Sequence, residues 1–416
     1  MKAFKPLVAA VASATVLAGL ATPALADVTL RLSIWGSTQV PMLEEISARF
    51  TEQHPDISIS IEPVPRSDYV TKLETSIVGG SGPDIFWNAL PDRFLDLSRL
   101  GLIENLSEWM ADDPIDLSPI APRLLDAFTY DGSLYAIPKD FDTVGLWYNK
   151  GLFDAAGIAY PDDTWTWETL RETAIALTDL DNNVYGFVVN PGTRQGYYNF
   201  IAQNGGKVIT DDHRSGFDMP ETIEAIQFMH DLIHVDGVSP TIQQTEEVNP
   251  QTRFQAGQAA MIFDGSWRAR AFDGDPNMME NARVAVLPKG VVRASSSGTL
   301  GYSINAGSAH KEEAWEFLKY LASPEVALIQ ASTGTVIPSH LDQAGVWVDA
   351  IPEFELQAFV EMADYAAVVS HSFNTPAWDQ PTRVLIKRAL AGDLAVEEAA
   401  SDIAELMNKV LAAEPN

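Results

Sequence analysis

The apolar residues that follow position 27 switch repeatedly between a period of two and a period of 3.6. Strand-like and helix-like segments alternate in the order 28–35, 41–50, 57–61, 69–78 and 84–87. A period of two is typical of a half-buried strand, and helical spacing is typical of an amphipathic helix. Strands that alternate with helices pair in parallel, because each helix carries the chain back across the sheet. The pattern therefore predicts an α/β fold with mostly parallel strands.

The first 26 residues have the pattern of a secretory signal peptide. Lys2 and Lys5 form a basic start, residues 7–20 are almost wholly apolar, and Ala24 and Ala26 supply the small residues that a signal peptidase accepts. The apolar run is short for a membrane span, and no second long run follows it. We expect cleavage after Ala26, a periplasmic location and a mature chain outside the membrane. An uncleaved anchor is the alternative.

Composition excludes several functional classes. Without cysteine the chain can hold no disulfide, no thiolate metal site and no cysteine nucleophile. A formal net charge of −30 argues against nucleic acid as a partner, because binding to phosphates requires clustered Lys and Arg. With 416 residues, 46% of them hydrophobic, the chain is long and apolar enough for two cores, so we expect two domains.

Two segments have the pattern of crossings between such domains. In the first, a strand ends at Pro138, a polar stretch with Asp140 and Asp142 follows, and an apolar strand occupies residues 144–148. In the second, residues 298–305 form a strand that is entered through a glycine turn. A polar crossing next to buried strands is the pattern expected of a hinge.

The sequence contains no nucleophile elbow, phosphate loop or dinucleotide-binding fingerprint. His230 and His234 are one helical turn apart, but no third metal ligand is evident, so we interpret them as the polar flank of a helix. Asp140 and Asp142 could form the carboxylate pair of a glycosidase. They could equally accept hydrogen bonds from sugar hydroxyls. We expect no cofactor and no metal.

Several tryptophans lie at strand ends, in turns or beside glycine and proline rather than along helical stripes. They are Trp35, Trp87, Trp147, Trp267 and Trp378. An indole can stack on the C–H face of a sugar ring while nearby polar groups bind its hydroxyls. Core packing is the alternative for each of them.

An ordered series of motifs spans nearly the whole chain after the signal segment. The motifs occupy residues 82–87, 135–150, 204–206, 254–267 and 301–318. The series resembles family 1 of the extracellular solute-binding proteins, the periplasmic receptors of carbohydrate ABC importers, in the layout of maltose-binding protein.

The resemblance implies a two-lobed periplasmic binding protein fold of type II, in which each lobe is a mainly parallel sheet flanked by helices. It divides the chain into a signal peptide (1–26), lobe 1 (27–137 and 298–337) and lobe 2 (138–297 and 338–416). The crossings would lie near residues 138–142, 297–300 and 336–340. The ligand would bind between the lobes, which close on it about this hinge.

The resemblance also implies a set of ligand-binding residues. They are Ser37, Gln39, Trp87, Asn88, Asp92, Arg93, Asp140, Asp142, Tyr197, Trp267, Gly298 and Trp378. Trp267 and Trp378 would stack on the sugar from one lobe, while Trp87, Asn88 and the turn 37–39 close from the other. The hinge carboxylate is either Asp140 or Asp142.

These observations predict a monomeric receptor without chemistry of its own, which captures a mono- or oligosaccharide and delivers it to the inner-membrane subunits of an ABC permease. A receptor for a polyol or glycerol derivative is one alternative. A secreted glycosidase, suggested by the paired aspartates, is another.

Overall fold

The computed structural model describes residues 28–89 and 94–415. The predicted signal peptide 1–26, its cleavage point and the predicted contacts Asp92 and Arg93 lie outside the described residues. Within the described ranges, no helix combines the length and the hydrophobicity needed to cross a membrane.

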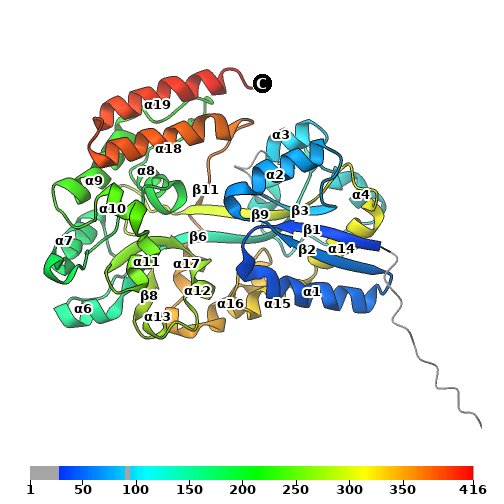
Figure 1. The fold of residues 1–416 in the computed structure, drawn as a ribbon, viewed down its shortest axis with the longest axis horizontal. Helices are drawn as coiled ribbons and strands as arrows, with labels where there is room; N and C mark the ends of the chain where they lie inside the picture. The colour runs from blue at the N-terminus through cyan, green and yellow to red at the C-terminus, as the bar shows by residue number, and fades with distance from the viewer. Residues whose placement is uncertain (1–27, 90–93, 416) are drawn as a thin grey trace, which may run out of the picture.

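Helices and strands alternate strictly from β1 to β3, and later in the chain runs of helices separate the strands (Figure 1). The first elements are β1 (Val28–Ile34), η1 (Ser37–Gln39), α1 (Val40–Gln53), β2 (Ile57–Pro63), α2 (Arg66–Val78), β3 (Ile85–Ala89), α3 (Phe94–Arg99), α4 (Leu106–Asp112), α5 (Pro122–Ala127), β4 (Thr129–Tyr130) and β5 (Ser133–Leu134). The middle elements are β6 (Ile137–Asn149), α6 (Lys150–Ala156), α7 (Trp167–Leu177), η2 (Leu180–Asn182), η3 (Thr193–Tyr197), α8 (Tyr198–Gln203), α9 (Pro220–His234), α10 (Ile242–Glu247), α11 (Pro250–Gln255), β7 (Met261–Gly265), α12 (Arg268–Phe272), α13 (Pro276–Asn281) and β8 (Ala282–Ala285). The last elements are β9 (Ser296–Ile304), α14 (Lys311–Leu321), α15 (Pro324–Ser332), β10 (Ile337–Pro338), η4 (Leu341–Gln343), α16 (Ala344–Ala350), η5 (Pro352–Phe354), α17 (Gln357–Met362), β11 (Ala367–Val368), α18 (Thr375–Ala391) and α19 (Val396–Leu411).

The βαβ opening confirms the alternation expected from the sequence. β1 pairs in parallel with both β2 and β3. The helix α1 has Pro41 in its first turn and buries Leu43, Ile46 and Phe50, which lie on one face because their spacing is three and four. This segment folds locally as its hydrophobic period requires.

The sheet also contains antiparallel strand pairs, which are formed by β6 and β9. The strand order is β10-β6-β9-β3-β1-β2, with β11 on β9 and with β7 and β8 on β6. β9 runs antiparallel to both β3 and β6, and β7 and β8 run antiparallel to β6. The resulting sheet is mixed, because the two long strands run in opposite directions through its centre.

The predicted break between two strands after Pro138 is wrong. β6 runs without interruption from Ile137 to Asn149, with only a register shift between Pro138 and Asp140. Gly298 is likewise inside β9 and not in a turn. The strands continue because β9 and β10 pair with β6 on either side and satisfy its backbone hydrogen bonds.

The three predicted crossings lie side by side in this sheet. Asp140 is opposite Leu300 of β9 and Pro338 of β10, and Asp142 is opposite Gly298. The polar residues of the crossings therefore meet at one place, although they are far apart in the sequence.

Two hydrophobic cores lie on either side of this place. The first core takes its buried residues from 30–137 and 302–329, and the second takes them from 120–124, 141–287 and 331–411. Residues 120–124, which the sequence assigned to lobe 1, pack in the second core. In Figure 1, β6 and β9 link the two halves, and α18 and α19 lie side by side over the half that contains the second core.

Candidate ligand-binding site

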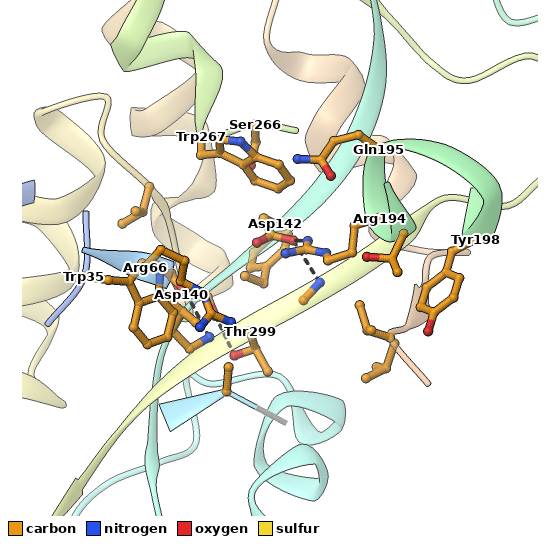
Figure 2. A pocket seen from close by; sticks show the side chains of 18 of the residues that line it. Trp35, Arg66, Asp140, Asp142, Arg194, Gln195, Tyr198, Ser266, Trp267 and Thr299 are labelled. Carbon is orange, nitrogen blue, oxygen red and sulfur yellow. Dashed lines mark hydrogen bonds and ion pairs between the residues drawn. The ribbon is translucent and has the colours of Figure 1, made fainter. Parts of the chain in front are cut away.

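A cavity of about 380 Å³ lies over the paired segments of β6 and β9 (Figure 2). Asp140, Asp142, Gly298 and Thr299 line it from these two strands. Other walls come from η1, α2, η3, β11 and α18, so segments that contribute to both cores surround it. The cavity therefore has the position expected of a site between two lobes.

Asp140 is held by a buried ion pair. The Lys139 Nζ contacts the Asp140 carboxylate and also donates to Gln39 Oε1 at 3.0 Å. The Lys139 side chain has 0% exposure, and its Nζ lies 4.8 Å from the centroid of the buried Trp87 ring. The Leu300 N–H donates to Asp140 Oδ1 at 3.1 Å. Protein groups thus occupy both oxygens of this carboxylate.

Asp142 is paired with Arg194 from η3. The Arg194 Nη2 donates to Asp142 Oδ1, which also accepts from the Gly298 N–H at 2.8 Å. Burial raises the pKa of the Asp142 carboxyl above its ordinary value, although the charge and hydrogen bond of Arg194 oppose the shift. A Cβ on Gly298 would lie 2.9 Å from Arg194 Cζ, so glycine leaves the space that the guanidinium occupies.

Arg194 reaches the cavity from a π-type turn. The Tyr197 N–H donates to the Gly192 carbonyl at 3.2 Å, which is an i to i+5 bond. Asn199 donates to the Arg194 carbonyl and accepts from the Ser296 N–H at 2.7 Å, which ties the turn to β9. Single π turns are frequent at functional sites.

Two indole rings form aromatic walls of the cavity. Trp35 follows β1 and packs on the first core, and Trp267 follows β7 and packs on the second. Arg66 Cζ lies 4.8 Å from the centroid of Trp35, and Arg194 Cζ lies 4.9 Å from that of Trp267. Figure 2 shows the two indoles on different sides of the cavity, each beside its arginine.

α18 contributes a polar stripe to the wall. Thr375, Asp379 and Arg383 line the cavity at a spacing of four, so they share one face of the helix. Arg383 Nε donates to Asp379 Oδ2 at 2.7 Å. The buried ring of Tyr198, at the start of α8, adds an aromatic surface.

Five of the residues predicted from the sequence line the cavity. They are Gln39, Asp140, Asp142, Trp267 and Gly298. Asp140, Asp142 and Gly298 lie on the predicted crossings in β6 and β9, whereas Gln39 joins them from η1 and Trp267 from the end of β7.

Five other predicted residues do not line the cavity. Trp87 and Trp378 have 0% exposure and pack in the two cores, and Tyr197 is equally buried. Asn88, at 2% exposure, donates to Ser303 Oγ, and Ser37 is exposed outside the cavity wall. For each buried ring, a nearby residue lines the cavity instead. Trp35, which contacts Trp87, is one, and Tyr198, which follows Tyr197, is another. Thr375 and Asp379 lie on either side of Trp378 in the sequence and also line the cavity.

Several lining residues were missed by sequence reasoning. They include Arg66, Arg194, Tyr198, Asp379 and Arg383. The spacing of four on α18 was a usable signal. The helix packs a buried tryptophan into the core, and a row of polar residues at this spacing indicates that another of its faces borders a polar cavity. Arg194 gave no such signal, since its partner Asp142 is 52 positions away.

The two histidines of α9 take structural roles. His234 Nε2 contacts the Leu390 carbonyl at 2.9 Å, and the two imidazole centroids are 4.5 Å apart. Among residues 28–89 and 94–415, no group of three His, Asp or Glu side chains is arranged to hold a metal ion.

Comparison with known proteins shows which family this chain resembles in sequence. Residues 35–328 match the sequence model of the bacterial extracellular solute-binding proteins. A maltotriose-binding protein of Pyrococcus abyssi is 28% identical over 309 residues, which cover 71% of this chain and 63% of the relative.

Solved structures show the same two-lobed fold. An ABC substrate-binding protein of Listeria monocytogenes in complex with cycloalternan superimposes with a TM-score of 0.87 at 27% identity, covering 93% of this chain and 99% of that one. A solute-binding protein of Thermotoga lettingae bound with α-D-tagatose gives a TM-score of 0.81 at 27% identity, covering 92% and 99%. The chain belongs to the bacterial extracellular solute-binding protein family, a family of receptors rather than enzymes.

Proposed function

We propose that this protein is the sugar-binding receptor of an ABC importer, which captures a mono- or oligosaccharide in the cavity between its lobes and delivers it to a membrane permease. The observation that carries the proposal is the pair of indoles, Trp35 and Trp267, on walls that belong to different cores. A sugar ring offers apolar C–H faces to such rings and hydroxyls to the polar groups between them. The similar proteins support this ligand class, because their names give maltotriose, cycloalternan and tagatose as what they bind.

The charges in the cavity favour an uncharged ligand. Three arginines and three aspartates line it, namely Arg66, Arg194, Arg383, Asp140, Asp142 and Asp379. Asp140 is paired with Lys139, Asp142 with Arg194, and Asp379 with Arg383. An anionic ligand such as a phosphorylated sugar would have to compete with these carboxylates, whereas sugar hydroxyls can both donate to and accept from them.

Closure of the two lobes on the sugar is the proposed transport signal. β6, β9 and β10 connect the halves, so small backbone rotations there would move one indole relative to the other. A sugar that contacts both walls binds the closed form more tightly and shifts the population toward it. In this proposal the exported protein loses its first 26 residues, acts as a monomer in the periplasm and carries out no catalysis.

A thermal-shift panel of monosaccharides, oligosaccharides and polyols tests the ligand class. A ligand present at 100 times its Kd stabilises the folded state by about 2.7 kcal/mol, which raises the melting temperature measurably. We expect a shift with at least one sugar and none with glycerol or sorbitol. A shift with polyols alone would replace the sugar by a polyol as the cargo, and no shift with any compound would contradict the proposal.

Incubation with chromogenic glycosides tests whether the protein hydrolyses glycosidic bonds. Asp140 and Asp142 each accept from a cation and a backbone N–H, an arrangement that suits fixed hydrogen-bond acceptors. We expect binding without release of the chromophore. Release that is lost in Asp142→Asn would identify a glycosidase and overturn the receptor assignment.

A further inference from the structure

Only one face of the Trp267 ring is available to a ligand. Trp267 directly follows Ser266 and Gly265, at the end of β7. A Cβ built on Gly265 would overlap three atoms of the six-membered ring at once, so the Gly265 backbone packs against one face of the indole. The opposite face is the one that a sugar would have to use.

In the structure Arg194 lies over this ring. Its Cζ is 4.9 Å from the ring centroid, and it lines the same cavity as the indole. Because the Gly265 backbone covers one face, we place the guanidinium over the face that looks into the cavity. In Figure 2 the Arg194 side chain extends from η3 toward Asp142, and the Trp267 ring lies above both.

The contacts of Arg194 both hold it over the ring and leave it able to move. Nη2 is anchored to Asp142, which in turn accepts from the Gly298 N–H. Nε is buried and has no hydrogen-bond partner among the described residues. The ion pair and the cation–π contact favour the position over the ring. The free-energy cost of leaving the buried Nε–H without a hydrogen bond opposes it.

We propose that Arg194 competes with the sugar for the inward face of Trp267, and that the ion pair with Asp142 sets how strongly it competes. The inference rests on the proposed function, because it assumes that a sugar stacks on Trp267. Asp142 and Gly298 act as the anchor about which the guanidinium swings away. Arg194 is thus a specificity-determining residue: a ligand enters only if its stacking on the indole exceeds that of the guanidinium.

A double-mutant cycle on Arg194 and Trp267 tests the competition. The Kd of maltotriose, or of the panel sugar with the largest thermal shift, is measured by calorimetry for the parent, Arg194→Ala, Trp267→Leu and the double variant. We expect Arg194→Ala to bind the sugar about three- to tenfold more tightly in the parent and to have no such effect when Trp267 is Leu. Weaker binding by the same factor in both backgrounds would make Arg194 an ordinary ligand contact and overturn the proposal, as would no change in either.

Two further variants secure the cycle. Arg194→Gln, which keeps a polar side chain but removes the charge and ends two atoms short of arginine, replaces Arg194→Ala if the alanine variant does not fold. Arg171→Ala is the matched control, because Arg171 also pairs with an aspartate, Asp236 at 2.7 Å, but does not line the cavity. It should leave the Kd unchanged. A change equal to that of Arg194→Ala would assign the effect to overall charge and contradict the proposal.

A measurement without sugar separates this proposal from the function on which it rests. In ¹⁵N-labelled protein, the resonance of the Arg194 Nε–H, identified by its loss in Arg194→Gln, should be shifted upfield by the indole ring. The shift should disappear in Trp267→Leu. If the resonance is unaffected by Trp267→Leu, the guanidinium does not cover the ring in solution, and the proposal fails even if sugars bind. If the shift is present but no sugar binds, the proposed function fails instead.

Discussion

Asp140 and Asp142 are two residues apart on β6 and line the same cavity, but their surroundings differ. Asp140 has 7% of its side chain exposed, and its partner Lys139 has none. Asp142 has 20% exposed and its partner Arg194 has 25%. Lys139 is enclosed by Gln39 and Trp87, whereas Arg194 extends over Trp267 with an unpaired Nε.

One strand can thus supply both a carboxylate that is fixed and one that can change partners. Removing one partner of a buried ion pair leaves the other charge in a medium of low polarity, so Asp140 is held in place. A partly exposed pair retains access to water and can exchange partners at a smaller cost. We therefore expect Asp140 to support the fold and Asp142 to take part in binding. Four predictions test this comparison, in order of decreasing effect.

The largest effect is expected for Lys139→Met. The substitution leaves the buried Asp140 without its cation, so the free energy of unfolding should fall by about 3–5 kcal/mol. Urea unfolding followed by circular dichroism measures the change. Lys409→Met is the control, because Lys409 and its partner Glu405 are 72% and 70% exposed, and its stability should match that of the parent. A loss no larger in Lys139→Met than in this control would contradict the comparison.

Trp267→Ala should act on binding instead of stability. Loss of the stacking surface should weaken the Kd of the bound sugar by roughly tenfold or more, because aromatic anchors contribute a large share of binding free energy. Titration calorimetry measures this. Trp109→Ala removes a partly exposed indole of the first core, outside the cavity wall, and should keep the sugar affinity of the parent. An unchanged Kd in Trp267→Ala would remove this ring from the site.

Gly298→Ala should lower the stability moderately, because it disturbs the ion pair of Asp142 with Arg194. The new Cβ would lie 2.9 Å from Arg194 Cζ and displace the guanidinium, at a cost of about 1 kcal/mol because the end of that side chain can move. Gly345→Ala in α16 is the control, since a Cβ there meets nothing within 4 Å and should stabilise the helix by about 0.5–1 kcal/mol. Equal effects of the two substitutions, measured by urea unfolding, would show that Arg194 does not need the space.

The smallest effect concerns pH. Burial raises the pKa of Asp142 in the folded state above 3.8, so the folded protein holds this proton more tightly than the unfolded chain does. The contribution of Asp142 to stability is then greatest when it is protonated, and it decreases as the pH rises from 3.8 through the folded pKa. The difference in unfolding free energy between the parent and Asp142→Asn should decline over this window. A difference that grows with pH would mean that the charge of Arg194 outweighs burial and lowers the pKa of Asp142.

Local sequence features predicted the regular elements well. Thr166 caps α7 and Ser323 caps α15 by accepting from backbone N–H groups, and α14 spans residues 311–321, where the apolar spacing places a helix. These features depend on neighbours within a few residues, so sequence is sufficient to find them. The break predicted in β6 failed because its continuity depends on strands more than 150 positions away.

The candidate site was predictable only in part, for the same reason. Gly298 and Asp142 follow from the crossings, but the pairing of Asp142 with Arg194 requires the fold. The aromatic residues show the limit most clearly. Trp35 and Trp87 are both tryptophans near strand ends, and their ring centroids are 5.4 Å apart, yet only Trp35 faces the cavity.

Local sequence was sufficient to predict the opening alternation of strands and helices and the helix caps, because hydrophobic period and capping chemistry act over a few residues. It also carried the family resemblance. Only the tertiary structure decided which indoles are walls and which are core, and which cation each aspartate of β6 receives. Those outcomes depend on contacts between distant segments, and burial, which decides whether a charge is fixed or exchangeable, exists only after the segments have packed.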